Sequence, residues 1–186
     1  MKTPFPFLRT LALLSPLLLA ACFPSEPPAP PAAPGAAPSA PPTSSAIQPL
    51  LDQTLAALQA LPNQAACSVE AVVALPAGSL QPAVNNTYTA ALNGDIKFIG
   101  FAADVDKGEP LARFTLLLAG RQVFGVQAAS GLERPDVGEY FKKPGLLKSG
   151  FQADISLKGV PAGEYLIMLR ADDGPVCPTH QKLKVD

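Results

Sequence analysis

Few side chains in this sequence could perform chemistry, and the search for a catalytic group starts with the only histidine, His180. A Ser-His-Asp or Cys-His arrangement would have to use it. The alternative is a surface position in a last strand, between Thr179 and Gln181. No G-x-S-x-G turn, glycine-rich phosphate loop or HExxH helix occurs in the sequence. We therefore expect no enzyme activity, no catalytic residue and no cofactor.

Cys22 indicates a different chemistry. The stretch Leu19-Ala20-Ala21-Cys22 ends an apolar run that follows two early basic residues, and it has the form of a bacterial lipobox. The run is short for a membrane span, and the two alanines admit a peptidase. We expect residues 1–21 to be a lipoprotein signal peptide and Cys22 to carry the lipid that holds the protein in the membrane. A plain secretory signal with a free Cys22 is the alternative.

Phe23 bears on the destination of such a lipoprotein. By resemblance to Gram-negative lipoproteins, the lack of Asp directly after the lipid-bearing cysteine implies sorting to the outer membrane. The expected location is the cell envelope, with the chain lipid-anchored and facing the periplasm.

The other two cysteines, Cys67 and Cys177, lie near the two ends of the predicted domain. An exported protein meets an oxidising compartment, and an even remainder of two cysteines predicts a disulfide. A metal pair or a catalytic thiol is the alternative, but neither cysteine has a second cysteine at ligand spacing, and His180 near Cys177 stands alone. We expect the disulfide and no metal.

Two acidic clusters are the remaining candidates for a site. The first comprises Asp104, Asp106 and Glu109, and the second is Asp172-Asp173-Gly174. Loop carboxylates of this kind can hold calcium, but neither cluster has the full twelve-residue loop pattern. We interpret both as solvated turns.

The N-terminal part of the mature chain predicts a tether and a helix. Residues 22–46 are dominated by Pro, Ala and Ser, which cannot bury enough apolar surface to fold, so we expect a disordered linker with polyproline II character. Such a stretch is a spacer or a ligand for aromatic-lined grooves. Over 47–62, leucines recur at the helical period, with Pro62 at the end. This predicted helix either packs on the folded domain or docks a partner.

Residues 66–186 change to an alternating pattern with turn signals between short apolar runs. Ile96, Phe98 and Gly100 are expected on one face of a strand. Ala119-Gly120-Arg121 suits a hairpin, and Val160-Pro161-Ala162-Gly163 suits a turn. About seven short strands of this kind predict an all-β fold, an antiparallel β-sandwich. The predicted strands are 68–73, 95–101, 113–118, 122–128, 152–157, 164–171 and 182–185.

Arg134 to Phe141 interrupts the strand pattern. Pro135 suits the first position of a short helical turn, with Val137, Tyr140 and Phe141 facing inward. We expect a crossover between the two sheets, in which Arg134 and Asp136 pair.

Five segments occur in an order that resembles a bacterial Ig-like β-sandwich module attached to many cell-envelope and sugar-related proteins. They are Cys67-Ser68-Val69-Glu70, Gly100-Phe101-Ala102-Ala103-Asp104, Arg134-Pro135-Asp136-Val137, Ser149-Gly150-Phe151 and Pro161-Ala162-Gly163-Glu164-Tyr165. Phe101 stands where that module usually has Trp. The resemblance implies an Ig-like accessory or structural domain and supplies no catalytic residue. Phe101 and Phe151 are interpreted as core aromatics.

The net charge of the chain limits the classes of partner that we expect. Two positive charges leave with residues 1–21, so the formal charge changes from −1 to −3, and no basic stripe is present. Nucleic acid is therefore not expected as a partner. The leading hypothesis is a non-enzymatic envelope lipoprotein whose sandwich serves interaction or structure, with an envelope protein as partner. The alternative is a module that binds carbohydrate or peptidoglycan in the cell wall.

Overall fold

The computed structural model describes residues 45–186 except 64, 77, 83–84 and 173. Cys22, the predicted signal peptide and almost all of the predicted linker lie outside the described residues. Within them, no helix is long and apolar enough to cross a membrane.

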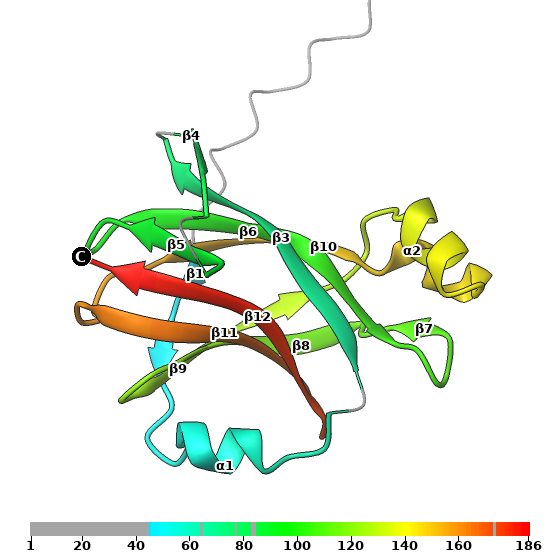
Figure 1. The fold of residues 1–186 in the computed structure, drawn as a ribbon, viewed down its shortest axis with the longest axis horizontal. Helices are drawn as coiled ribbons and strands as arrows, with labels where there is room; N and C mark the ends of the chain where they lie inside the picture. The colour runs from blue at the N-terminus through cyan, green and yellow to red at the C-terminus, as the bar shows by residue number, and fades with distance from the viewer. Residues whose placement is uncertain (1–44, 64, 77, 83–84, 173) are drawn as a thin grey trace, which may run out of the picture. The chain divides into compact units, whose positions relative to one another are not determined.

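The described chain forms two sheets of six strands each, stacked as two layers (Figure 1). Sheet I has the order β1–β10–β6–β3–β4, with β7 paired to β6: β1 (Ser45–Ala46), β10 (Gly150–Ser156), β6 (Asp95–Asp104), β3 (Ala66–Leu75), β4 (Gly78–Leu80) and β7 (Glu109–Pro110). Sheet II has the order β2–β9–β8–β11–β12–β5: β2 (Gln48–Pro49), β9 (Val123–Ala129), β8 (Arg113–Ala119), β11 (Gly163–Ala171), β12 (Val176–Val185) and β5 (Thr87–Ala90). The expected all-β sandwich is confirmed. Two edge pairings, β1 with β10 and β5 with β12, are parallel rather than antiparallel.

The main core lies between the sheets and follows the predicted alternation. Ile96 and Phe98 of β6 are both buried on the predicted face. Phe114 and Phe151 meet edge to face with ring centroids 5.0 Å apart, one from each sheet. Gly100 is required on this face, because a Cβ there would lie 1.9 Å from the backbone oxygen of Ser68. Aromatic and β-branched side chains on alternating positions therefore fill the space between the layers.

The helix predicted over 47–62 is largely wrong. The only helix there is α1, Leu55–Gln59, which begins where the Thr54 hydroxyl accepts a hydrogen bond from the Ala57 N–H (3.1 Å). The residues before it form β1 and β2, which pair with β10 and β9, so the sandwich includes residues ahead of the boundary expected at 66. A short isolated helix is marginal in water, whereas open strand edges offer this segment backbone partners.

α1 packs on the outer face of sheet II. Its Leu58 is fully buried in a cluster with Leu117, Met168 and Val176. Leu51, which the helical pattern would also place on the apolar face, is 86% exposed. The predicted packing of a helix on its own domain is therefore confirmed only for the short helix α1.

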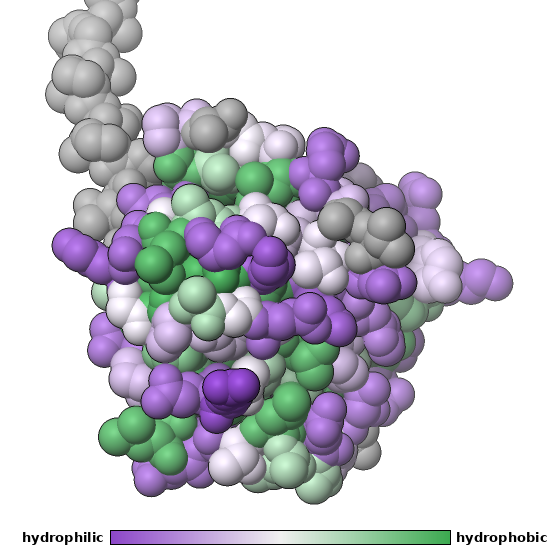
Figure 2. Space-filling model, turned by 60° about the vertical axis from the view of Figure 1, so that its left-hand side comes forward, coloured by the Kyte–Doolittle hydropathy of each residue, from purple (hydrophilic) through white to green (hydrophobic). Residues whose placement is uncertain are grey.

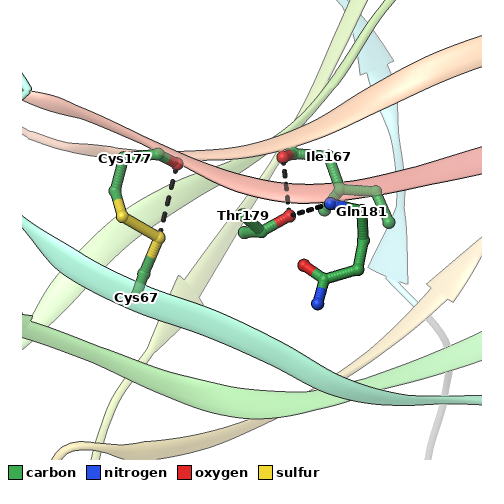
Figure 3. The surroundings of a disulfide bond; sticks show 5 residues. All are labelled: Cys67, Ile167, Cys177, Thr179 and Gln181. Atoms are coloured by element: carbon green, nitrogen blue, oxygen red, sulfur yellow. Dashed lines mark hydrogen bonds between the residues drawn. A yellow bond between two sulfur atoms is a disulfide. The ribbon is translucent and has the colours of Figure 1, made fainter. Parts of the chain in front are cut away.

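Cys67 of β3 and Cys177 of β12 form the expected disulfide, with Cα atoms 6.1 Å apart (Figure 3). The bond links sheet I to sheet II. The Sγ of Cys67 also lies 3.4 Å from the carbonyl oxygen of Cys177. On the same strand, the buried Thr179 hydroxyl donates to the Ile167 carbonyl (2.8 Å). The last strand is therefore fixed to both layers.

The predicted crossover is confirmed between β9 of sheet II and β10 of sheet I. It contains α2 (Pro135–Tyr140) and a 3-10 helix, η1 (Pro144–Lys148). α2 lies at the right-hand end in Figure 1, away from the C-terminus at the left. The left-hand side of Figure 1 is turned toward the viewer in Figure 2. On this face, polar and apolar residues are mixed over the surface rather than joined into one large apolar area (Figure 2).

Candidate binding surface beside α2

Among the described residues, neither His180 nor the acidic clusters form a reactive group. His180 is exposed on β12, where its φ of 62° marks the irregular pairing with β11. Asp104, Glu109 and Asp172 line one surface hollow together with Lys107 and Arg113. Hydrogen bonds from the Lys107 backbone and side chain lower the pKa of Asp104, and Arg113 lies 3.6 Å from Asp172. Among the described residues, no group of three or more His, Cys, Asp or Glu side chains could hold a metal ion.

Arg134, the N-cap residue of α2, is the centre of a second group of charged side chains. Its Nε and Nη2 donate to the two oxygens of Asp136 (2.8 and 2.6 Å), as the sequence predicted. Its Nη1 and Nη2 also donate to both oxygens of Glu70 on β3 (each 2.8 Å). The guanidinium therefore holds two carboxylates in paired hydrogen bonds, the geometry for which its planar fork is suited.

These contacts fix the charge state of the group. Hydrogen bonds to Asp136 and Glu70 raise the pKa of Arg134 above its ordinary value, and the Arg134 hydrogen bonds lower the pKa of Asp136. Four of the five guanidinium N–H donors are occupied by these carboxylates. Arg134 is thus a positioning residue, and it is poorly placed to bind an incoming anion.

The Arg134 guanidinium also lies over an aromatic ring, 5.6 Å from the centroid of Phe101. Phe101 meets Phe141 edge to face at 6.3 Å, and Phe141 meets Tyr140 at 4.9 Å. These groups surround a hollow of about 440 Å³, here called the aromatic hollow. Its lining residues are Glu70, Phe101, Arg134, Asp136, Val137, Tyr140 and Phe141.

A second hollow, of about 450 Å³, lies on the other side of α2. It is lined by Pro135, Gly138, Glu139, Lys142, Pro144 and Leu147. α2 is therefore a ridge between two largely apolar depressions. Below this ridge, Val137 and Leu146 pack with Ala103 in a small cluster separate from the main core.

Tyr140 stands out on this ridge. It was expected to face inward, and this is wrong: its side chain is 81% exposed, while Val137 is buried and Phe141 half-buried. A helix of six residues has only one apolar side to bury, and Val137 and Phe141 occupy it. Leu132 and Leu147, at the same end, are 46% and 41% exposed.

The end of α2 departs from ordinary preference. The Lys143 N–H donates to the Gly138 carbonyl (2.9 Å), and the Lys142 N–H donates to the Glu139 carbonyl (3.1 Å). This is a Schellman ending, in which Lys142 takes the left-handed position with a φ of 55°. Glycine is the usual residue there because it carries no Cβ.

Some of this surface could be anticipated and some could not. The motif order drew attention to Arg134 and Asp136, but Glu70 lies 64 positions away, with no signal linking the two. Phe151 is a core aromatic as expected, whereas Phe101 is half-buried and lines the aromatic hollow.

Comparisons of the chain with protein-family models, with curated proteins and with solved structures each found no match. The function is therefore proposed from this chain's own residues and geometry.

Proposed function

We propose that this protein is a lipid-anchored lipoprotein of the bacterial cell envelope whose Ig-like β-sandwich is a non-enzymatic interaction module. The observation that carries the anchor is the sequence Leu19-Ala20-Ala21-Cys22 after a short apolar run. A disulfide between the two sheets fits a chain that matures in an oxidising compartment. With acyl chains on Cys22, each buried CH₂ contributes about 0.8 kcal/mol to membrane binding.

The observation that supports an interaction role is the surface beside α2. It combines an exposed tyrosine and exposed leucines with two apolar hollows. An interaction site of this kind typically has aromatic side chains on a rigid support. Arg134 supplies such a support by tying the start of α2 to Glu70 of sheet I.

Labelling with an alkyne fatty acid tests the anchor. The wild-type chain should incorporate the label and sediment with membranes, and Cys22→Ala should lose both properties. Incorporation that survives Cys22→Ala would refute the assignment.

For the outer-membrane destination, Phe23→Asp should move the protein to the inner-membrane fraction of a density gradient, while Phe23→Ser should leave it in place.

Binding of carbohydrate or peptidoglycan is the second candidate, and exposed Tyr140 is the observation that favours it. Sugar rings stack on exposed aromatic rings, and the nearby carboxylates of Asp136 and Glu70 could accept hydroxyl hydrogen bonds. Purified cell-wall sacculi should then retain the wild type and release Tyr140→Ala. The matched control is Leu51→Ala, which removes an equally exposed apolar side chain that lines neither hollow. Equal retention of all three proteins would dismiss this candidate.

A further inference from the structure

We propose that the aromatic hollow binds a lysine or arginine side chain presented by a protein partner. This inference rests on the proposed interaction role of the surface beside α2, and it names the chemistry that the partner must carry. It does not depend on the lipid anchor. Three properties support it: the aromatic rings of the hollow, the charge of its carboxylates, and the apolar depression on the other side of α2.

The rings of the hollow suit a cation. Tyr140 and Phe141 meet edge to face with centroids 4.9 Å apart, and Phe141 meets Phe101 in the same way at 6.3 Å. The face of an aromatic ring carries partial negative charge and attracts ammonium and guanidinium groups. Arg134 already makes such a contact, 5.6 Å from the centroid of Phe101. Tyr140 is 81% exposed, so its ring is accessible to a cation from outside the chain.

The carboxylates of Glu70 and Asp136 give the hollow an unbalanced negative charge. They and Arg134 are the charged residues of its lining, so two negative charges and one positive charge leave a net charge of −1. Each of the four carboxylate oxygens accepts one hydrogen bond from Arg134, whereas an ionised carboxylate offers about four acceptor sites. The side chains of Glu70 and Asp136 are 42% and 64% exposed. They can therefore accept hydrogen bonds from an incoming ammonium or guanidinium group.

The neighbouring lysines do not cancel this charge from within the hollow. The Lys143 ammonium donates to the carbonyl oxygen of Asp106 (3.2 Å), and Lys142 lines the second hollow with Glu139. Neither lysine belongs to the lining of the aromatic hollow. Hydrogen bonds from Arg134 also lower the pKa of Asp136, so its carboxylate stays ionised at neutral pH. The site is thus complementary in charge to a basic side chain.

The second hollow favours a protein over a small amine. Its lining includes Pro135, Pro144 and Leu147, and Leu147 is 41% exposed. Because both hollows flank α2, one partner surface can cover them together, with a basic residue on one side and apolar side chains on the other. A choline headgroup suits the site less well, because its quaternary nitrogen has no N–H to donate to Glu70 or Asp136.

Two peptides that differ only in charge test the proposal. The first is acetyl-Leu-Ser-Lys-Ser-Leu-amide, and the second carries an Nε-acetylated lysine at its centre. Each is titrated into the whole isotope-labelled protein, purified in a neutral polyoxyethylene detergent, while amide chemical shifts are followed. We expect the lysine peptide to shift the signals of Glu70, Phe101 and residues 134–141. It should bind at least about fivefold more tightly than the acetylated peptide.

Variants assign this preference to the rings and to the charge. Tyr140→Leu keeps an apolar side chain but loses the π face, and Asp136→Asn removes one negative charge. Each should reduce the preference for the lysine peptide to about twofold or less. Tyr140→Phe keeps the ring and should retain the full preference. Leu51→Ala, an exposed control that lines neither hollow, should also retain it.

Four outcomes would overturn the inference. Equal affinities of the two peptides at residues 134–141 would leave an apolar interaction surface without a preference for cations. Shifts of equal size around Glu109 and Asp172 would mean unspecific attraction to carboxylates. Tighter binding of choline than of the lysine peptide would assign the hollow to a lipid headgroup. If neither peptide shifts residues 134–141, the inference fails, while a single partner crosslinked to residue 140 in envelopes would still uphold the proposed function.

Discussion

The space between the two sheets and the surface beside α2 are built from similar residue types but held by different forces. Between the sheets, Phe98, Phe114 and Phe151 are fully buried, and a disulfide joins the layers. Beside α2, Tyr140 faces solvent, and an arginine with two carboxylates fixes the backbone that carries it. Burial makes the first region stable. Ion pairs and a small separate cluster allow the second to be rigid while keeping its aromatic surface exposed.

The largest expected effect falls on the link between the sheets. Cys67 and Cys177 are separated by 110 positions. A loop of this length contributes about 4.7 kcal/mol in the chain-entropy model. The double variant Cys67→Ala, Cys177→Ala should lose most of that stability in denaturant unfolding. A loss below about 1 kcal/mol would contradict the assumption that the bond limits the unfolded chain.

Truncation of a core aromatic should have a similar or slightly smaller effect. Phe114→Ala removes a ring with no exposed surface and should cost about 3–5 kcal/mol. Tyr140→Ala should change the free energy of unfolding by no more than about 0.5 kcal/mol, because its ring is exposed. Guanidinium unfolding of the two variants measures the contrast between the regions. Equal losses in the free energy of unfolding would contradict this contrast.

Removal of the positioning arginine should act locally. Arg134→Ala loses the contacts with Glu70 and Phe101, which are partly exposed and together contribute about 1 kcal/mol. We expect faster amide hydrogen exchange in α2 and η1 and unchanged exchange in β8 and β11. Arg134→Lys keeps the charge but loses the planar fork, so it should resemble Arg134→Ala. Uniform acceleration across both sheets would show that Arg134 supports the whole fold.

At the left-handed C-terminal end of α2, we expect a substitution that raises the stability of the protein. Lys142→Gly should stabilise the protein by up to about 1 kcal/mol, since glycine relieves the positive φ at this position. The control Lys148→Gly, in η1, should instead destabilise it or leave it unchanged, because that residue has no positive φ. Thermal unfolding of both variants measures the difference, and a destabilised Lys142→Gly would contradict the account.

Acid should loosen the α2 end slightly before the core. Hydrogen bonds from Arg134 lower the folded-state pKa of Asp136, so their stabilisation is present above the ordinary aspartate pKa. It is lost as the pH falls through the lowered value. Hydrogen exchange in α2 should therefore rise at acid pH, and Asp136→Asn should remove that dependence. A pH response unchanged in Asp136→Asn would assign the effect to another group.

The sequence predicted the parts of the fold that depend on local alternation. β6, β8, β9 and β11 lie where the pattern placed them, because a two-residue period is needed to bury one face of each strand. β5 was not predicted, since it has only four residues and follows two asparagines at positive φ. The helix over 47–62 failed for a different reason: Pro49 belongs to an edge strand, and open strand edges compete with a short helix for the backbone.

The candidate surface depended on contacts that cross the chain. Arg134 and Asp136 were readable as neighbours, but Glu70 comes from another strand of the sandwich. The side chain of Tyr140 points outward because α2 is short, and the sequence pattern did not predict the length of this helix. Sequence pattern therefore indicated where the surface would be and missed which side chains it exposes.

Photocrosslinking from residue 140 in intact envelopes tests the central claim most directly. A photoreactive amino acid replaces Tyr140 in the lipidated protein, and the same amino acid at Leu51 serves as the matched exposed control. The account predicts adducts from position 140 and few or none from position 51. It also predicts that the adduct peptides identify one defined partner. Equal adducts from both positions, or none from position 140, would contradict the claim that the surface beside α2 is the interaction site.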